Sequence, residues 1–344
     1  MKEIKIGDRV IKPDAPVFCI AEIGINHNGD IELAKKMVEA AAESGASAIK
    51  FQYFSVENLV IKEADYYGGM EVVSQFEMFK KTELTIEDYK ELFKLAKELN
   101  VLAFCSVFDE EKVDILHDLG VPAFKIASGD ITHIPLLKYV ARKGLPIFLS
   151  TGMSTLHEVK EAVEAIESQG NDQIVLLHCV NNYPARVEDT HLLKMKSLKD
   201  HFDYPVGISD HTDTIYAALG AVALGGLVIE KHFTVDRNIY GVDNYFSLEP
   251  QMFKEMVNGA EAIRVALGSP AKEPAESEAE SRKLQRRSLV SKTEILKGTR
   301  ITKDMITIKR PGTGIYPKYL NDVYGKKAKT NIKKDVVITW DILE

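Results

Sequence analysis

Short apolar runs alternate with amphipathic stretches from residue 17 to about residue 268. The apolar runs read VFCIAEI, AIKFQYF, LAFCSV, AFKIAS, PIFLST, IVLLHCV, PVGISD and LVIEKHF. Between them, stretches such as IELAKKMVEAAAES and TIEDYKELFKLAKEL repeat apolar residues at three- and four-residue spacing, as helices that cover a sheet do. Eight strands that are each followed by a helix predict a closed parallel (β/α)8 barrel, the TIM-barrel fold.

An open doubly wound sheet is the main alternative architecture. Such a sheet usually has fewer strands, and its first strand is often followed by the turn G-x-G-x-x-G. The corresponding segment here, AEIGINHNGD, lacks that turn, which favours the barrel. The segment from about 53 to 84 is longer than a usual βα loop, so we expect it to form a lid or a wall at one rim.

The composition changes after Gly268. The segment GSPAKEPAESEAESRKLQ combines proline, small residues and dense charge, which predicts a linker over 269–286. From 287 to 344, short β-type runs such as SLVSKT and TRITKDMITIKR are separated by turns such as KGT and RPGTG. This pattern predicts a small β-rich domain over 287–344, after a barrel domain over 1–268.

Charge and composition narrow the classes of function. The 344 residues are 45% hydrophobic and 28% charged, which is typical of a globular protein. A net charge of −7 makes nucleic acid an unlikely partner class. The start of the chain lacks a signal-peptide pattern, and no run approaches the roughly 18 apolar residues of a membrane span, so we expect a cytoplasmic protein with no membrane partner. Cys19, Cys105 and Cys179 lie in apolar segments and predict buried, reduced thiols.

Polar residues gather where the predicted strands end. In a TIM barrel the reactive groups lie at the carboxyl ends of the strands. Side chains alternate between the two faces of a strand, so polar residues two apart project to the same side and converge on one mouth if that side is inward. The candidates are Glu22, the pair Lys50 and Gln52, Ser106, Lys125, Ser128, Ser150, Thr151, Asn181, the pair Ser209 and His211, and the pair Glu230 and His232.

His211 and His232 end the seventh and eighth predicted strands, which are neighbours in a closed barrel. Two imidazoles there suit one divalent ion, with oxygen ligands or water completing its coordination. No third protein ligand is obvious, which favours an open Mn²⁺, Mg²⁺ or Co²⁺ site over a closed structural zinc site. The alternative, which we adopt for the remaining histidines, is ordinary packing in the core.

Lys50 and Lys125 project into the predicted mouth. An unpaired ammonium group is costly to bury, so each lysine needs an anionic partner. Glu22 and Glu230 are one possible source. The other is a substrate that carries both a phosphate and a carboxylate, held by the lysines and by neighbouring serine hydroxyls. Phosphoenolpyruvate carries both groups and fits this demand.

Eight segments occur along the chain in the order AEIGINHNGD, IKFQ, KIASGD, LSTGM, NNYP, GISDHT, EKHFT and KRPGTG. In this order they resemble the sialic acid synthase family, which covers N-acetylneuraminate synthases and the related legionaminic and pseudaminic acid synthases. The resemblance spans essentially the whole chain. It implies a TIM barrel followed by an antifreeze-like SAF domain. It also implies a transferase that condenses phosphoenolpyruvate with an N-acyl mannosamine-type sugar and releases phosphate by C–O cleavage.

The same resemblance implies roles for single residues. His211 and His232 match metal ligands, usually of Mn²⁺. Arg310 matches an arginine that enters the barrel mouth of the partner subunit, which implies a domain-swapped homodimer. Among the others, Glu22 and Glu230 match acidic positions that orient groups or handle protons; Gln52, Tyr183 and Asp243 match positions near the amino sugar; and Lys50, Ser106, Lys125, Ser128, Ser150, Asn181 and Ser209 match positions that hold phosphoenolpyruvate.

Two differences bear on the acceptor sugar. Asp130 stands where many neuraminate synthases have a glutamate near the sugar site, and GVD around Asp243 replaces the more usual GPD. The leading acceptor is N-acetylmannosamine, the second is 2,4-diacetamido-2,4,6-trideoxymannose, which gives N,N'-diacetyllegionaminate, and the pseudaminate precursor is third. Two other classes remain as alternatives. A metal-dependent hydrolase would have little need for the two inward lysines. In a carbohydrate-binding or surface-binding protein, a functional metal site in the barrel would be superfluous.

Overall fold

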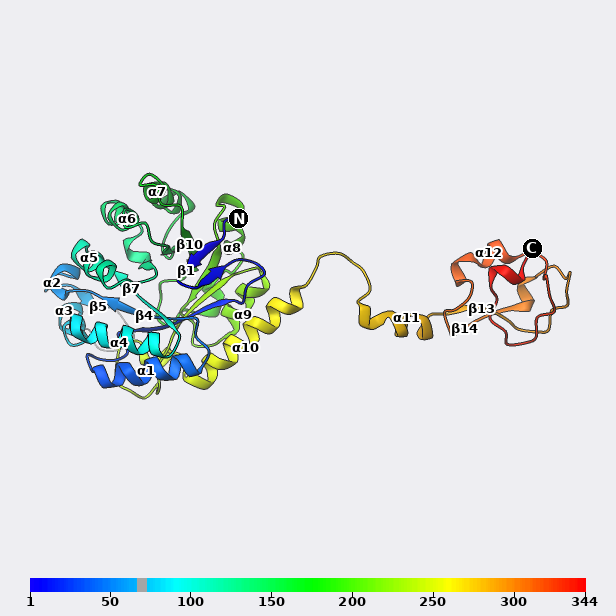
Figure 1. Ribbon diagram of the computed structural model, residues 1–344, viewed down its shortest axis with the longest axis horizontal. Coiled ribbons are helices and arrows are strands. Elements are labelled where there is room, and N and C mark those ends of the chain that lie inside the picture. The colour runs from blue at the N-terminus through cyan, green and yellow to red at the C-terminus, as the bar shows by residue number, and fades with distance from the viewer. Residues whose placement is uncertain (67–72) are drawn as a thin grey trace. The chain divides into compact units, whose positions relative to one another are not determined.

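A closed barrel of eight parallel strands forms the centre of the first of two units, Met1–Gly268 and Ser269–Glu344 (Figure 1). This computed structural model describes residues 1–66 and 73–344. The strands follow one another around the barrel in chain order, so the predicted TIM barrel is confirmed. They are β3 (Phe18–Gly24), β4 (Ala48–Tyr53), β7 (Leu102–Val107), β8 (Phe124–Ile126), β9 (Ile147–Ser150), β10 (Ile174–Cys179), β11 (Val206–Asp210) and β12 (Val228–His232).

Amphipathic helices lie outside these strands (Figure 1). Their starts are set by local sequence: Thr85 and Thr155 each form a capping box with an acidic residue three positions later, which satisfies free amide groups of the first turn. Their apolar faces pack on the barrel and form its outer core. The helices are α1 (Ile31–Glu43), α4 (Ile86–Glu98), α5 (Glu110–Asp118), α6 (Ile134–Ala141), α7 (Leu156–Glu167), α8 (Lys194–His201), α9 (Tyr216–Ala223) and α10 (Pro250–Leu267).

Three phenylalanine rings form a layer inside the barrel. Phe18, Phe104 and Phe148 come from β3, β7 and β9, which are alternate strands of the barrel. The ring centroids are 5.8 Å apart for Phe18 and Phe148 and 5.2 Å apart for Phe104 and Phe148. Residues two positions further on, Ser106 and Ser150, project inward one layer nearer the carboxyl ends. The phenylalanine layer is therefore the apolar floor of a polar mouth.

Two segments of the first unit lie outside the repeating pattern. The strands β1 (Ile4–Ile6) and β2 (Arg9–Ile11) form an antiparallel hairpin that the sequence analysis did not predict, and its isoleucines belong to the main core. The segment 53–84 contains α2 (Val56–Leu59), β5 (Asp65–Tyr66), β6 (Val73–Ser74) and α3 (Gln75–Lys80). Because 67–72 lie outside the described residues, its role as a lid or wall stays a prediction.

The second unit has a small core of its own, which includes Leu289, Ile301 and Ile338. The strands β13 (Ser288–Ser291) and β14 (Ile306–Lys309) pair antiparallel. Within the stretch 269–286, which was expected to be a linker, α11 covers Ala279–Gln285. A second short helix, α12, covers Leu320–Val323 in the small domain. None of the helices that the structure describes is long and apolar enough to cross a membrane.

Candidate active site

Lys50 lies at the centre of a buried charge cluster in the mouth of the barrel. Its ammonium nitrogen is 2.7 Å from Glu22 Oε2 and donates a hydrogen bond to Ser106 Oγ at 2.9 Å. Glu230 Oε2 lies 3.9 Å from the same nitrogen. These side chains come from β3, β4, β7 and β12, so the barrel brings together residues that are far apart in the sequence.

Glu230 joins Lys50 to the second lysine of the cluster. Lys125 Nζ lies 3.5 Å from Glu230 Oε1, and that oxygen accepts a hydrogen bond from Ser209 Oγ at 2.7 Å. Lys125 also donates to the carbonyl of Ile126 at 3.3 Å. Both lysines therefore have carboxylate partners in the protein itself, which was one of the two possibilities left by the sequence. Two ammonium groups face two carboxylates, so the cluster is balanced in charge, with Lys125 held at the longer distance.

The two carboxyl groups of this charge cluster are shifted in opposite directions. Burial raises the pKa of Glu22 although Lys50 opposes the shift. For Glu230, burial acts in the same sense, but Lys125 and Lys50, with smaller contributions from Ser209 and His211, lower its pKa. Carboxyl groups in one site whose pKa values are pushed apart are suited to separate roles as proton donor and proton acceptor.

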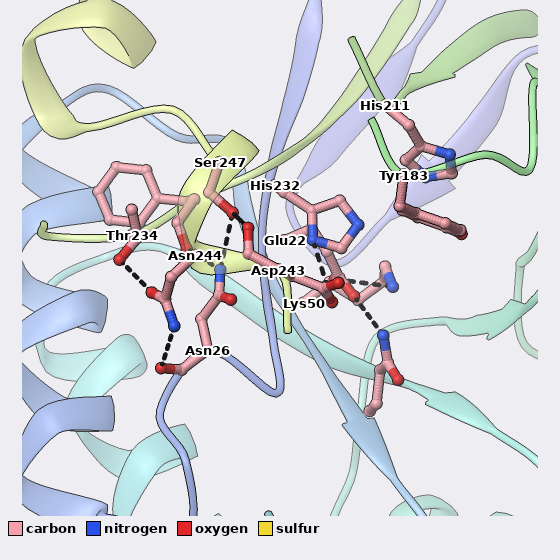
Figure 2. Close-up of polar contacts among 12 residues, drawn as sticks. Glu22, Asn26, Lys50, Tyr183, His211, His232, Thr234, Asp243, Asn244 and Ser247 are labelled. Atoms are coloured by element: carbon pink, nitrogen blue, oxygen red, sulfur yellow. Dashed lines mark hydrogen bonds and ion pairs between the residues drawn. The ribbon is translucent and has the colours of Figure 1, made fainter. Parts of the chain in front are cut away.

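The two candidate metal ligands are close together at the ends of neighbouring strands. The ring centroids of His211 and His232 are 5.3 Å apart. Tyr183 lies beside both, with its ring centroid 4.3 Å from that of His211 and 5.9 Å from that of His232 (Figure 2). His211 Nδ1 bonds the carbonyl oxygen of Val180 at 2.7 Å, and His232 Nδ1 lies 3.7 Å from Asp243 Oδ2. The barrel thus brings the predicted pair together.

The donor atoms of this histidine pair fit a divalent ion. A carbonyl only accepts, so Nδ1 of His211 donates to Val180. Nε2 of His211 lies 3.4 Å from Ser209 Oγ and is the nitrogen that would hold a metal when the ring is neutral. His232 Nδ1 is buried and has no hydrogen-bond partner among the described residues, and burial lowers the pKa of His232 well below its ordinary value. Within residues 1–66 and 73–344, no group of three or more histidine, cysteine, aspartate and glutamate side chains is arranged to hold an ion. The metal therefore stays a prediction based on two imidazoles.

The predicted serines lie around the charge cluster in different states of hydrogen bonding. Ser106 accepts from Lys50, and Ser128 Oγ accepts from the amide of Gly152 at 3.0 Å. Ser150 Oγ is buried without a hydrogen-bond partner in the part of the chain that the structure describes. An unpaired buried hydroxyl is a free donor for an oxygen of a ligand.

The residues predicted to be near the sugar line the outer part of the mouth. Gln52 Nε2 donates to Glu22 Oε1 at 3.3 Å, which links it to the charge cluster. Tyr183 donates its hydroxyl hydrogen to Asn181 Oδ1 at 2.9 Å. Asp130 lies in a 3₁₀ turn after β8, and burial raises its pKa to about 6.

Asp243 is held over the mouth by a buried network of amides and hydroxyls that the sequence analysis did not single out. Asn26 Nδ2 donates to Ser247 Oγ at 2.9 Å, and Ser247 Oγ donates to the carbonyl of Asp243 at 2.6 Å (Figure 2). Asn244 Nδ2 donates to the carbonyl of Asn26 at 3.2 Å, and Asn244 Oδ1 accepts from Thr234. Burial raises the pKa of Asp243 to about 7. Asn26 stands within AEIGINHNGD, but its partners lie more than 200 residues away in the chain and no pattern in the sequence signals them.

Arg310 belongs to the second unit, where it directly follows β14 and is exposed to solvent. The structure holds one copy of the chain, so the predicted contact of Arg310 with a partner subunit stays a prediction.

The fold and the site define a TIM-barrel enzyme with a charge-balanced cluster of two lysines and two carboxylates beside two imidazoles. Comparison with known proteins gives the family. The sequence profile of the NeuB family matches residues 37–272, and that of the SAF domain matches 286–344. The chain therefore belongs to the NeuB family, and its second unit is a SAF domain.

Relatives of this chain agree with that assignment. The N,N'-diacetyllegionaminic acid synthase of Campylobacter jejuni is 43% identical over 93% of this chain and 98% of the relative. The enzyme of the same name from Legionella pneumophila is 41% identical over 95% and 94%. The crystal structure of an N-acetylneuraminic acid (sialic acid) synthetase from Leptospira borgpetersenii is 37% identical with a TM-score of 0.75, covering 81% of this chain and 95% of that one. The resemblance found in the sequence is confirmed, and the protein is a nonulosonic acid synthase.

Proposed function

We propose that this synthase condenses phosphoenolpyruvate with N-acetylmannosamine to make N-acetylneuraminate. The observation that carries the proposal is the buried cluster of Lys50, Lys125, Glu22 and Glu230 beside the His211 and His232 imidazoles. In this reaction the enol carbon of phosphoenolpyruvate forms a bond to the aldehyde carbon of the open-chain sugar. Water then adds to C2, and the resulting tetrahedral centre expels inorganic phosphate as its C–O bond breaks.

The two lysines are the proposed anchors for phosphoenolpyruvate. Lys125 is the more available of the two, because its contact with Glu230 is 3.5 Å long while Lys50 has a 2.7 Å contact with Glu22. A phosphate or carboxylate oxygen that reaches Lys125 forms a shorter, charge-assisted hydrogen bond in its place. The hydroxyl of Ser150, which has no partner among the described residues, is the proposed second donor.

Glu22 and Glu230 are the proposed proton carriers. At rest Glu22 is ion-paired with Lys50; its raised pKa lets it take up a proton when Lys50 turns to the substrate anion, and Glu22 then donates that proton to the sugar oxygen as the carbon–carbon bond forms. The lowered pKa of Glu230 keeps it ionised, which suits it to accept a proton from the attacking water. Ser209, which donates to Glu230, holds that carboxylate in place.

We propose that His211 and His232 hold one divalent ion, most suitably Mn²⁺, with Mg²⁺ and Co²⁺ as alternatives. When bound, such an ion supplies electrophilic polarisation of the aldehyde. Tyr183 and Asp243, which lie against the two rings, orient the sugar beside them.

A second acceptor, 2,4-diacetamido-2,4,6-trideoxymannose, is supported by the 41% and 43% identity to two N,N'-diacetyllegionaminic acid synthases. The two acceptors differ at positions 4 and 6 of the sugar, so a direct comparison separates them. The experiment is phosphate release by metal-stripped, Mn²⁺-reconstituted protein with phosphoenolpyruvate and each sugar in turn, and with His211→Ala as the control variant. Preference for one sugar assigns the enzyme, and no release with either refutes both assignments.

We also propose a homodimer in which Arg310 of each subunit enters the barrel mouth of the other. In support, Arg310 is an exposed cation directly after β14. In the barrel, both lysines of the charge cluster are already paired with carboxylates of the same subunit. An additional cation from outside the barrel supplies the charge that a doubly anionic substrate requires.

A further inference from the structure

A second buried ion pair lies directly behind the candidate metal ligands. Asp210 and Lys231 are register partners on the neighbouring strands β11 and β12. Lys231 Nζ lies 2.8 Å from Asp210 Oδ2, and each of the two side chains is 1% exposed. His211 follows Asp210 in the chain, and His232 follows Lys231, so each member of the ion pair is the immediate neighbour of one imidazole.

This ion pair is on the outer face of the barrel wall. Ser209 and Glu230, whose side chains hydrogen-bond to each other, project into the mouth. Because side chains alternate along a strand, His211 projects to the same side as Ser209, and Asp210 and Lys231 project to the opposite side. No substrate in the mouth can therefore touch the pair, and neither residue belongs to the proposed reaction.

The contacts of Lys231 reach both sides of His211. Its ammonium group donates to the carbonyl oxygen of Thr212 and, at 3.2 Å, to the hydroxyl of Thr212, in addition to its contact with Asp210. Asp210 Oδ1 in turn accepts the amide of Thr212 at 2.9 Å. The ammonium group of Lys231 thus contacts both the residue before His211 and the residue after it. Lys231 is itself the residue before His232.

A buried ion pair is weak evidence for stability, since replacing both partners with uncharged residues is often neutral or stabilising. The contacts of the ion pair on both sides of His211 are a better explanation for its place behind the two imidazoles. We infer that Asp210 and Lys231 are positioning residues that fix the distance and orientation between the His211 and His232 imidazoles. The metal part of this inference rests on the proposed function; the positional part does not.

The test uses the double variant Asp210→Asn/Lys231→Met, which removes both charges and leaves no unpaired one. Asparagine keeps an acceptor for the amide of Thr212, and methionine keeps the length of the lysine stem. The matched control is Ile229→Val, because Ile229 and its register partner Ile208 lie one pair earlier on the same outer face. Wild type, double variant and control are compared in thermal unfolding, in Mn²⁺ affinity by electron paramagnetic resonance, and in amide exchange of residues 209–214 without metal.

The expected result is Mn²⁺ binding weakened by about tenfold or more in the double variant, as for other residues that orient metal ligands. Faster amide exchange at 209–214 accompanies it, while the unfolding temperature falls no further than in Ile229→Val. Mn²⁺ affinity and exchange at the level of the control overturn the inference. If wild type itself binds no Mn²⁺, the proposed metal function fails, and the exchange measurement alone then decides whether the ion pair positions the His211 segment.

Discussion

Lys50 and Glu22 form an ion pair of 2.7 Å inside the barrel, between adjacent strands and almost entirely shielded from solvent. Such a pair gains little over apolar packing when both charges are present, but leaving one of them alone in the interior is costly. The two residues are therefore coupled, and the coupling is measurable.

Lys50→Met leaves Glu22 without its shortest contact. We expect a loss of about 3–5 kcal/mol in the free energy of unfolding, and recovery of part of that loss in Lys50→Met/Glu22→Gln. Urea unfolding of the two single variants and the double variant checks this. Strictly additive losses would show that the ion pair contributes nothing beyond its separate parts.

Lys125→Ala removes the lysine with the longer carboxylate contact. Because Lys125 is proposed to bind the substrate anion, we expect the KM for phosphoenolpyruvate to rise by about 10- to 100-fold, as the loss of one charge-assisted hydrogen bond implies. Lys112→Ala is the matched control, since Lys112 is also a buried lysine but lies on helix α5. Steady-state kinetics with an unchanged KM for phosphoenolpyruvate would remove Lys125 from the anion site.

Asn244→Ala breaks the network that holds the Asp243 loop. Its amide bonds both the Asn26 carbonyl and the Thr234 hydroxyl, so we expect a loss of about 1–3 kcal/mol in stability and a higher KM for the sugar. Asn238→Ala, at an exposed residue of the same connection that bonds only Asp236 in the described contacts, should change neither. A sugar KM that stays at the wild-type value despite the lost stability would mean that the network does not position Asp243.

Asp130 predicts a pH dependence of stability. Burial raises its folded-state pKa from 3.8 to about 6, so the folded state favours the protonated carboxyl. The stabilisation that it contributes is complete below pH 3.8 and is lost as the pH rises towards 6. Asp130→Asn removes this dependence, so the variant gains stability relative to wild type between those pH values. Unfolding temperatures measured across this range check the sign, and parallel curves for the two proteins would exclude the shift.

Arg310→Ala is expected to impair turnover while the barrel stays folded. If Arg310 acts across a dimer, mixing Arg310→Ala with His211→Ala restores activity, since one barrel of each mixed dimer receives an intact arginine. Random pairing predicts about a quarter of the wild-type activity. Mixed dimers of proven composition with no activity would place the arginine outside the partner's site.

The fold was predictable because buried parallel strands read as continuous apolar runs, and the ends of two of them are marked by the polar residues His211 and His232. Chain order then made β11 and β12 neighbours, which brought the two histidines together. The choice between Glu22 or Glu230 and a substrate as partner of the lysines was not predictable, because it depends on distances across the barrel. The Asn26 network and the contacts of Lys231 likewise join segments through tertiary packing, and no spacing in the sequence signals them.

The phenylalanine layer affects how the ionisable groups above it titrate. Phe18, Phe104 and Phe148 form the apolar floor of the mouth in which Lys50, Glu22, Glu230 and Lys125 are buried, so water screens the interactions among these charges only weakly. Groups that interact this strongly titrate together, and each apparent ionisation constant belongs to the whole set. A pH profile of turnover will therefore report macroscopic steps of a four-membered acid, and replacing any one member will move them all.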